Sequence, residues 1–113
     1  MKINKLNKDM LELIEKIRLK YNIEQKIELV YTNRKVQVGL TAYVPKSKNI
    51  TIGISRKSLL KYGEQEAFKL LRHELAHAIC MAKNLDAGHN SIHFKQFCIE
   101  LNADARSCIG KKV

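Results

Sequence analysis

EQEAFKLLRHELAHAICMAK, the stretch from Glu64 to Lys83, decides the fold of this chain. Its apolar residues recur at spacings of three and four, which is the period of an amphipathic helix. They are Phe68, Leu71, Leu75 and Ile79. Asn84 follows them, where a helix commonly ends on a residue that tolerates left-handed backbone. We therefore expect a long helix over about residues 64–83, separated by Gly63 from a short helix that Ser55 and Ser58 can cap.

The centre of this stretch, His73-Glu74-Leu75-Ala76-His77, follows the pattern HExxH. Histidines four apart on a helix lie on one face, so their imidazole nitrogens can converge on one Zn²⁺. Glu74 lies close enough to take a proton from a zinc-bound water, and the resulting hydroxide attacks a carbonyl. Ordinary solvated histidines are the plainer interpretation, but these lie beside the apolar stripe of a helix expected to pack on a sheet. The pattern predicts a zinc metallopeptidase with Glu74 as its general base.

A catalytic zinc needs a third protein ligand, and the sequence offers three candidates. His89 comes twelve residues after His77, in a loop that can fold back over the helix. His93 lies on the next expected helix, where it could equally be a half-buried supporting residue. Glu100 lies at a distance that suits a glutamate ligand on a downstream helix, with Asp104 placed to orient a histidine. The residues alone leave the choice among these three open.

Five further segments complete the expected fold. Apolar spacings of three and four predict helices over about residues 4–21 and 91–101. Three segments rich in β-branched and aromatic residues predict strands over 27–31, 36–44 and 49–55. We expect these strands to form an antiparallel meander, with turns at Asn33–Lys35 and Pro45–Lys48. The sequence thus predicts an α+β fold with an N-terminal helix, a three-stranded antiparallel sheet, the HExxH helix and a C-terminal helix.

Length and composition fit a single folded domain over residues 1–113. Hydrophobic residues make up 45% of the chain and charged residues 28%, which excludes a disordered or low-complexity protein. The 21 Lys and Arg residues against 11 Asp and Glu give a net charge of +10, which favours polyanionic partners, with nucleic acid first. Aromatic residues are only 6% and Trp is absent, which argues against binding by base stacking. Any nucleic acid should therefore be contacted mainly at its phosphates.

The basic residues of the two expected turns are the best candidates for phosphate contacts. They are Arg34, Lys35, Lys46 and Lys48. We expect the turns of a meander to bring these charges together near the helix-borne site. The sequence shows no base-reading motif, so binding should be sequence-nonspecific and should weaken as salt rises.

Cysteine usage and the N-terminal residues bear on the compartment. Cys80, Cys98 and Cys108 form neither an even set nor a CxxC pair, which argues against a secreted disulfide framework and favours a reducing compartment. Charged residues are interleaved throughout residues 1–20, which contain neither the apolar core of a secretory signal nor an apolar run long enough to span a membrane. We therefore expect a cytoplasmic, monomeric protein without membrane contact.

Several segments together resemble one known family. Around and after the HExxH pattern they are Leu70–Ala78, Asp86–His89, Phe94 and Leu101–Arg106. Upstream of it they are Asn33–Lys35, Gly39, Tyr43 and Ile50–Ser55. Spread over most of the chain, these segments resemble the SprT-like zinc metalloprotease domain of the bacterial and phage relatives of the Spartan DNA–protein crosslink protease.

This resemblance implies a zincin-like α+β fold, a single Zn²⁺ and protein substrates on or near DNA. In the family the third zinc ligand is a histidine in a Gly-His or His-Gly step about a dozen residues after HExxH, with an aromatic residue soon afterwards. Carried onto this chain, the pattern implies His89 as the third ligand, with His93 as the alternative. The chain lacks the two CxxC pairs of the zinc ribbon found in many relatives, so a second zinc is not expected.

The leading hypothesis is a zinc-dependent metallopeptidase in which His73, His77 and His89 hold the metal and Glu74 activates water. The alternative belongs to a different class: a basic DNA-binding accessory protein with a structural zinc and little or no hydrolytic activity. Glu74 argues against this alternative, because a structural zinc is normally closed by four ligands and requires no carboxylate base beside it.

Overall fold

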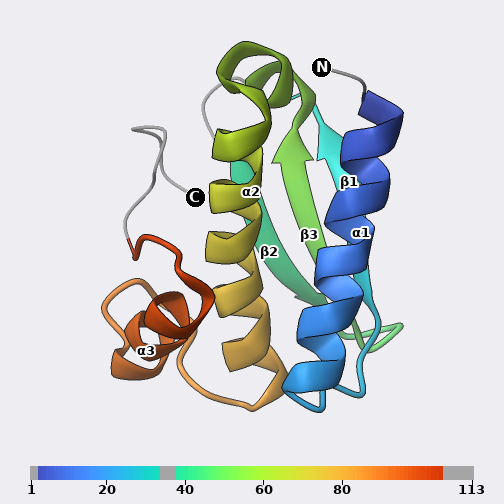
Figure 1. The fold of residues 1–113 in the computed structure, drawn as a ribbon. Coiled ribbons are helices and arrows are strands. Elements are labelled where there is room, and N and C mark those ends of the chain that lie inside the picture. Colours follow the sequence, from blue (N-terminus) through green and yellow to red (C-terminus); the bar gives the residue numbers. More distant parts are fainter. Residues whose placement is uncertain (1–2, 34–37, 106–113) are drawn as a thin grey trace.

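The computed structural model describes residues 3–33 and 38–105, which form an α+β fold (Figure 1). Within these residues the helices are α1 (Ile3–Lys20), α2 (Arg56–Ala82) and α3 (Ile92–Leu101). The strands are β1 (Ile27–Thr32), β2 (Gly39–Val44) and β3 (Asn49–Ser55). Each predicted helix and strand has its counterpart here, because the apolar period of each segment is a local property of its sequence.

The three strands form a mixed sheet in the order β1–β3–β2. β2 pairs antiparallel with β3 across the turn Pro45–Lys48, as predicted, but β1 pairs with β3 in parallel. The predicted antiparallel meander is therefore wrong for β1. β3 takes the central place, where Ile50, Ile52 and Ile54 are fully buried, and this puts β1 and β2 on opposite sides of it. The turn predicted at Asn33–Lys35 falls mostly outside the described residues, and β1 and β2 are not neighbours in the sheet.

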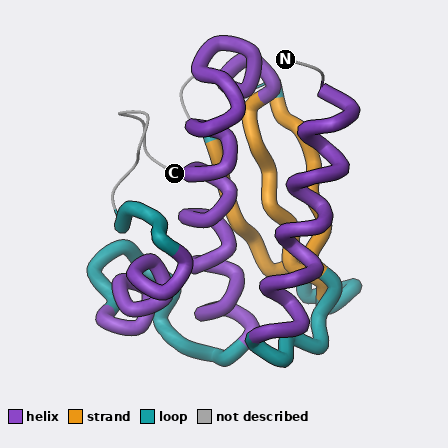
Figure 2. Tube along the Cα trace, in the orientation of Figure 1, coloured by secondary structure: helices purple, strands orange, loops and turns teal. Residues whose placement is uncertain are grey.

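α1 and α2 lie side by side over one face of the sheet, as Figure 2 shows. α1 turns an apolar stripe towards the sheet, formed by the buried residues Leu6, Met10, Ile14 and Ile17. This stripe belongs to one hydrophobic core with the inward side chains of β3 and the apolar face of α2. Close packing of this core fixes the position of α2, whose inner face contacts both β2 and β3.

α2 joins the two helices predicted on either side of Gly63 into one bent element. Gly63 has φ 85° and ψ 179°, a backbone conformation that glycine adopts far more readily than other residues. Ser55 caps the first segment, because its side chain accepts a hydrogen bond from the Ser58 N–H. Asn84 follows the second segment with a φ of 56°, as the sequence predicts for the end of this helix.

α3 packs against the C-terminal half of α2, beside the sheet rather than on it (Figure 1). Ser91 caps it by accepting a hydrogen bond from the Phe94 N–H at 3.3 Å, and Asn102 ends it in a left-handed conformation. Residues 83–91 connect α2 to α3 and run along α2 at this point. No helix in the described part of the chain is long and apolar enough to cross a membrane.

Candidate metal centre

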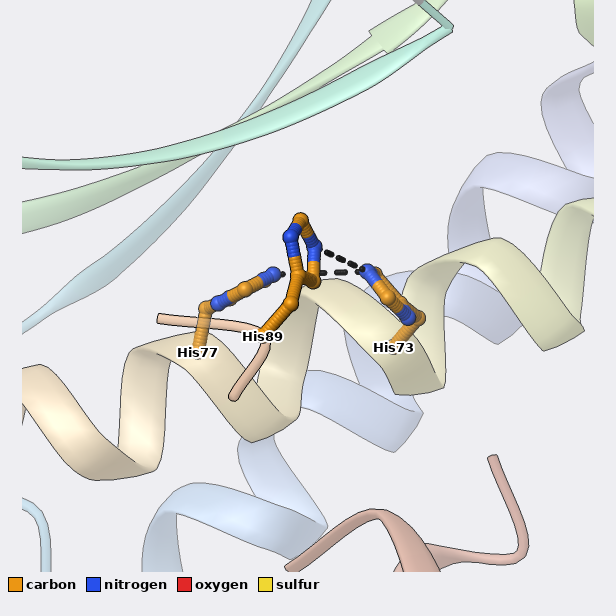
Figure 3. Close-up of side chains that lie close together, drawn as sticks. All are labelled: His73, His77 and His89. Atoms are coloured by element: carbon orange, nitrogen blue, oxygen red, sulfur yellow. Dashed lines mark hydrogen bonds between the residues drawn. The ribbon is translucent and has the colours of Figure 1, made fainter. Parts of the chain in front are cut away.

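Three histidines converge on one point beside α2, and Figure 3 shows their rings turned towards one another. His73 and His77 lie one turn apart on α2 and are buried, with 1% and 7% of their surface exposed. His89 reaches them from the connection between α2 and α3. The Nε2 atom of His73 lies 3.3 Å from that of His77 and 3.3 Å from that of His89. Each of the three can thus offer one nitrogen to a shared ion.

Backbone carbonyls fix the orientation of the two helix histidines. Nδ1 of His73 lies 2.6 Å from the carbonyl oxygen of Asp104, and Nδ1 of His77 lies 2.6 Å from that of Ala87. A carbonyl oxygen only accepts hydrogen bonds, so each Nδ1 must carry a proton, and in its neutral form each ring then keeps a lone pair on Nε2. Facing lone pairs repel one another unless a cation lies between them. Such outer carbonyl contacts are typical of histidines that bind metal.

The distances from the His73 nitrogen to the other two fit a tetrahedral metal ion. Zinc–nitrogen bonds of about 2.0–2.1 Å place tetrahedral ligands about 3.3–3.4 Å apart, which agrees with both His73 distances. The pKa of His77 is lowered to about 4, chiefly by burial and also by the nearby His73 and His89, although the hydrogen bond to Ala87 raises it. His77 is therefore a neutral imidazole, and able to bind a metal, throughout the neutral pH range.

Phe94 holds the rings in place from the side of α3. It is fully buried and stacks on the His77 ring, with 4.2 Å between the centroids and 19° between the planes. Its ring also meets the edge of the His73 ring, with the centroids 5.3 Å apart. The site therefore has an apolar wall, which limits the rotation of both imidazoles.

The connection between α2 and α3 folds back on itself to place His89. The side chain of Asp86 accepts a hydrogen bond of 2.9 Å from the Gly88 N–H, and the Ser91 N–H donates one of 3.0 Å to the Gly88 carbonyl. The Leu85 N–H bonds to the Cys80 carbonyl at the end of α2. These bonds form the folded-back loop that the sequence analysis expected for His89.

Glu74 lies between the two helix histidines in sequence and is fully buried under β2. The Thr41 hydroxyl donates a hydrogen bond of 2.6 Å to Glu74 Oε1 and lies 3.1 Å from the backbone oxygen of the same residue. Glu74 Oε2 is buried and has no hydrogen-bond partner among the described residues. Burial raises the pKa of the Glu74 carboxyl to about 7, while the Thr41 hydrogen bond lowers it. Thr41 was not among the predicted site residues, because the apolar residues of this strand, Leu40, Ala42 and Val44, alternate with it and so gave no signal that it faces the site.

The other predicted residues lie apart from this group. His93 is exposed on α3, and Glu100 accepts a hydrogen bond of 2.8 Å from the Tyr21 hydroxyl, so neither joins the three histidines. Asp104 orients His73, but through its backbone oxygen rather than its carboxylate.

That the basic residues of the two turns contact phosphates stays a prediction. Lys46 and Lys48 are exposed in the turn after β2, at the opposite end of that strand from Gly39. Arg34 and Lys35 lie outside the described residues.

Fold and site together define an α+β protein with a candidate three-histidine metal centre on a buried helix that also carries a carboxylate. The model of the SprT-like family matches residues 7–112 of the chain. The chain therefore belongs to the SprT-like family, in agreement with the resemblance seen in its sequence. Neither a curated protein nor a solved structure matches it.

Proposed function

We propose that this protein is a zinc-dependent metallopeptidase in which His73, His77 and His89 hold one Zn²⁺ and Glu74 is the general base. The observation that carries the proposal is the convergence of three imidazole nitrogens, with those of His77 and His89 each at tetrahedral spacing from that of His73, on a helix that also buries a carboxylate oxygen without a partner among the described residues. Membership of the SprT-like family supports it, because that family is generally one of metalloproteases.

The donor set favours zinc over the hard cations. Three neutral imidazoles suit zinc and its neighbours in the transition series, whereas Mg²⁺ and Ca²⁺ prefer oxygen ligands. Among the described residues only three side chains contribute, which leaves a tetrahedral ion one open position, as in catalytic rather than structural zinc sites. When bound, zinc would acidify water and polarise the carbonyl of the scissile peptide bond.

Glu74 would handle the protons of the reaction. Its Oε2 accepts one proton from the attacking water as the new oxygen–carbon bond forms, and then gives a proton to the leaving amine as the carbon–nitrogen bond breaks. A nearby dication favours the charged carboxylate and so offsets the effect of burial on the pKa of Glu74. Thr41 stays on Oε1 throughout, so the two carboxylate oxygens have separate tasks.

An extended polypeptide is the substrate shape that fits this site best. β2 is an edge strand and has a hydrogen-bonded neighbour on one side only among the described strands. Thr41 of this strand touches Glu74, so a peptide that paired with the open edge of β2 would pass close to the metal centre. Main-chain pairing of this kind binds a peptide with little regard to its sequence.

Nucleic acid is the proposed second partner. The net charge of +10 supports phosphate contacts, with Lys46 and Lys48 exposed in the turn after β2 and Arg34 and Lys35 as further candidates. The family resemblance adds that substrates are proteins on or near DNA. Binding should be independent of base sequence and should weaken steeply with salt.

One experiment tests these proposals together. Zinc content and cleavage of a basic test protein, reduced and alkylated lysozyme, are measured with and without DNA for the wild type and Glu74→Gln. We expect about one zinc in each protein, because the glutamate is not a ligand, and a loss of hydrolysis by about 10²- to 10⁴-fold in the variant. Zinc with no cleavage by the wild type would favour the DNA-binding accessory protein instead. Absence of zinc would contradict both.

A further inference from the structure

Two residues of β2 touch the carboxylate of Glu74, each in a different way. The Thr41 hydroxyl donates its hydrogen bond to Oε1 at 2.6 Å. Gly39, two residues earlier on the same face of the strand, lies so close that a Cβ atom there would come within 3.0 Å of Oε2. It would also come within 3.0 Å of a methyl group of Leu70. β2 therefore presents to the carboxylate one hydrogen-bond donor, the Thr41 hydroxyl, and one position without a side chain, Gly39.

A glutamate side chain needs such support because it is flexible. Its terminal torsion is broad, so an unsupported carboxylate presents either oxygen in many directions. Thr41 is a stiff partner: its β-branched side chain favours few rotamers, and its backbone is fixed by antiparallel pairing opposite Ile52. The hydroxyl is thus a donor in a fixed position, which a longer side chain could not supply as reliably.

We propose that Thr41 and Gly39 are positioning residues for the general base. Thr41 holds Oε1, and Gly39 leaves the space in which Oε2 stays without a partner among the described residues. This division decides which carboxylate oxygen receives the proton. The inference rests on the proposed peptidase function, but it concerns β2, which carries none of the residues that define the HExxH pattern.

Thr41→Val tests the donor, because valine keeps the branched shape and removes the hydroxyl. We expect kcat to fall about 10- to 100-fold with KM within about twofold, since the change affects the chemical step and not substrate binding. Zinc affinity should not change. Thr41→Ser restores the hydroxyl and should recover most of kcat. The matched control is Thr51→Val on β3, which lies on the opposite face of the sheet and should leave kcat unchanged.

Gly39→Ala tests the gap and has its own control. Its Cβ would crowd Oε2, so kcat should fall while the zinc content stays at one per chain. Gly53→Ala on β3 creates similar crowding, at 3.2 Å from Thr32 and 3.3 Å from Leu40, but on the face away from Glu74. It should lower stability without lowering the kcat of the folded protein. Equal kcat losses in the two variants would overturn the role of Gly39.

A second measurement does not depend on activity. Urea unfolding midpoints are compared for the wild type, Thr41→Val, Glu74→Ala and the double variant, all without metal. If Thr41 bonds to the carboxylate, Thr41→Val lowers the midpoint when Glu74 is present and has less than half that effect when the Glu74→Ala change has already removed the carboxylate. If Thr41→Val lowered the midpoint equally with and without the Glu74 carboxylate, the hydrogen bond between the two residues would be contradicted.

The two proposals fail in different ways. A wild type that binds zinc but does not cleave overturns the peptidase function, and this inference with it. A wild type that cleaves, together with a Thr41→Val protein of unchanged kcat, overturns only the positioning role. A Thr41→Ser protein that stays as slow as Thr41→Val also overturns it, because the hydroxyl would then not be the group that matters.

Discussion

α1 and α2 cover the same face of the sheet, yet they bury different kinds of side chain. α1 turns only apolar residues inward, among them Met10 and Ile14, which are 0% and 3% exposed. α2 buries His73, Glu74 and His77 along with its apolar stripe, and none of the three is more than 7% exposed. Burial of polar groups costs free energy unless each finds a partner. The comparison indicates that α1 contributes only to stability, whereas α2 also carries the candidate metal site.

The buried polar side chains of α2 obtain hydrogen-bond partners from outside the helix. Asp104 and Ala87 supply backbone oxygens to the two histidines, and Thr41 supplies a hydroxyl to Glu74. α1, by contrast, buries no polar residue among those described: Asn7, which accepts a hydrogen bond from the Tyr31 hydroxyl, is only half-buried, and Arg18 pairs with Glu15 at the exposed edge. Glu74 Oε2 is a buried side-chain oxygen of α2 without a partner among the described residues, so the proposed reaction uses an atom whose burial is unfavourable to folding.

The largest effect should come from removing a histidine of the α2 site. His89→Ala removes one of the three converging nitrogens and should lower zinc affinity by at least about 100-fold, because even outer contacts contribute 10- to 100-fold. His93→Ala should change the affinity less than about threefold, since His93 is exposed and lies outside the group. Competition with a chelator of known affinity measures both. If His93→Ala lost more zinc affinity than His89→Ala, His93 rather than His89 would be the third ligand.

The elements of the site differ in how far the sequence alone could predict them. His73 and His77 are four residues apart on one helix, so their geometry follows from the helical period. The partner of Glu74 is 33 residues away on β2, and that contact depends on which strand lies beside α2. The antiparallel meander was predicted wrongly for the same reason. The alternation of residues in β1 indicates which face is buried, but it does not indicate that β3 is the parallel neighbour. Backbone donors and acceptors such as the Asp104 carbonyl carry no residue signature at all.

The next effect concerns the stability of the metal-free protein as pH changes. Burial raises the folded-state pKa of Glu74 to about 7, against an ordinary value of 4.5. Between these values the folded state binds more protons than the unfolded state, so the contribution of Glu74 to stability falls as pH rises from 4.5 to 7. Relative to Glu74→Gln, the wild type should lose up to about 3 kcal/mol over this range.

His77 acts in the opposite direction, and the comparison removes its effect. Its folded pKa is lowered to about 4, so stability rises as pH increases from 4 to its ordinary value of 6.5. Both proteins contain His77, so its contribution cancels in the difference. Met10→Ala on α1 is the control, which should cost about 2–5 kcal/mol at every pH because no charge changes. Urea unfolding from pH 4.5 to 7.5 measures the free energy of unfolding of the wild type, Glu74→Gln and Met10→Ala. If the wild type and Glu74→Gln showed the same pH dependence, the raised pKa of the Glu74 carboxyl would be contradicted.

The smallest effect concerns the exposed lysines. Lys46 and Lys48 lie in the turn after β2, whereas Lys8 and Lys16 lie on the solvent side of α1, and each pair carries the same charge. If the turn contacts phosphates, replacing Lys46 and Lys48 by Ala should weaken binding to duplex DNA about 3- to 10-fold at 0.1 M salt. The double replacement should also make the slope of log binding constant against log salt concentration shallower by up to about two. The α1 pair acts only through the overall field, so its replacement should have less than half this effect. Equal effects from the two pairs would show that the charge attracts DNA from all sides and that the turn is no special contact.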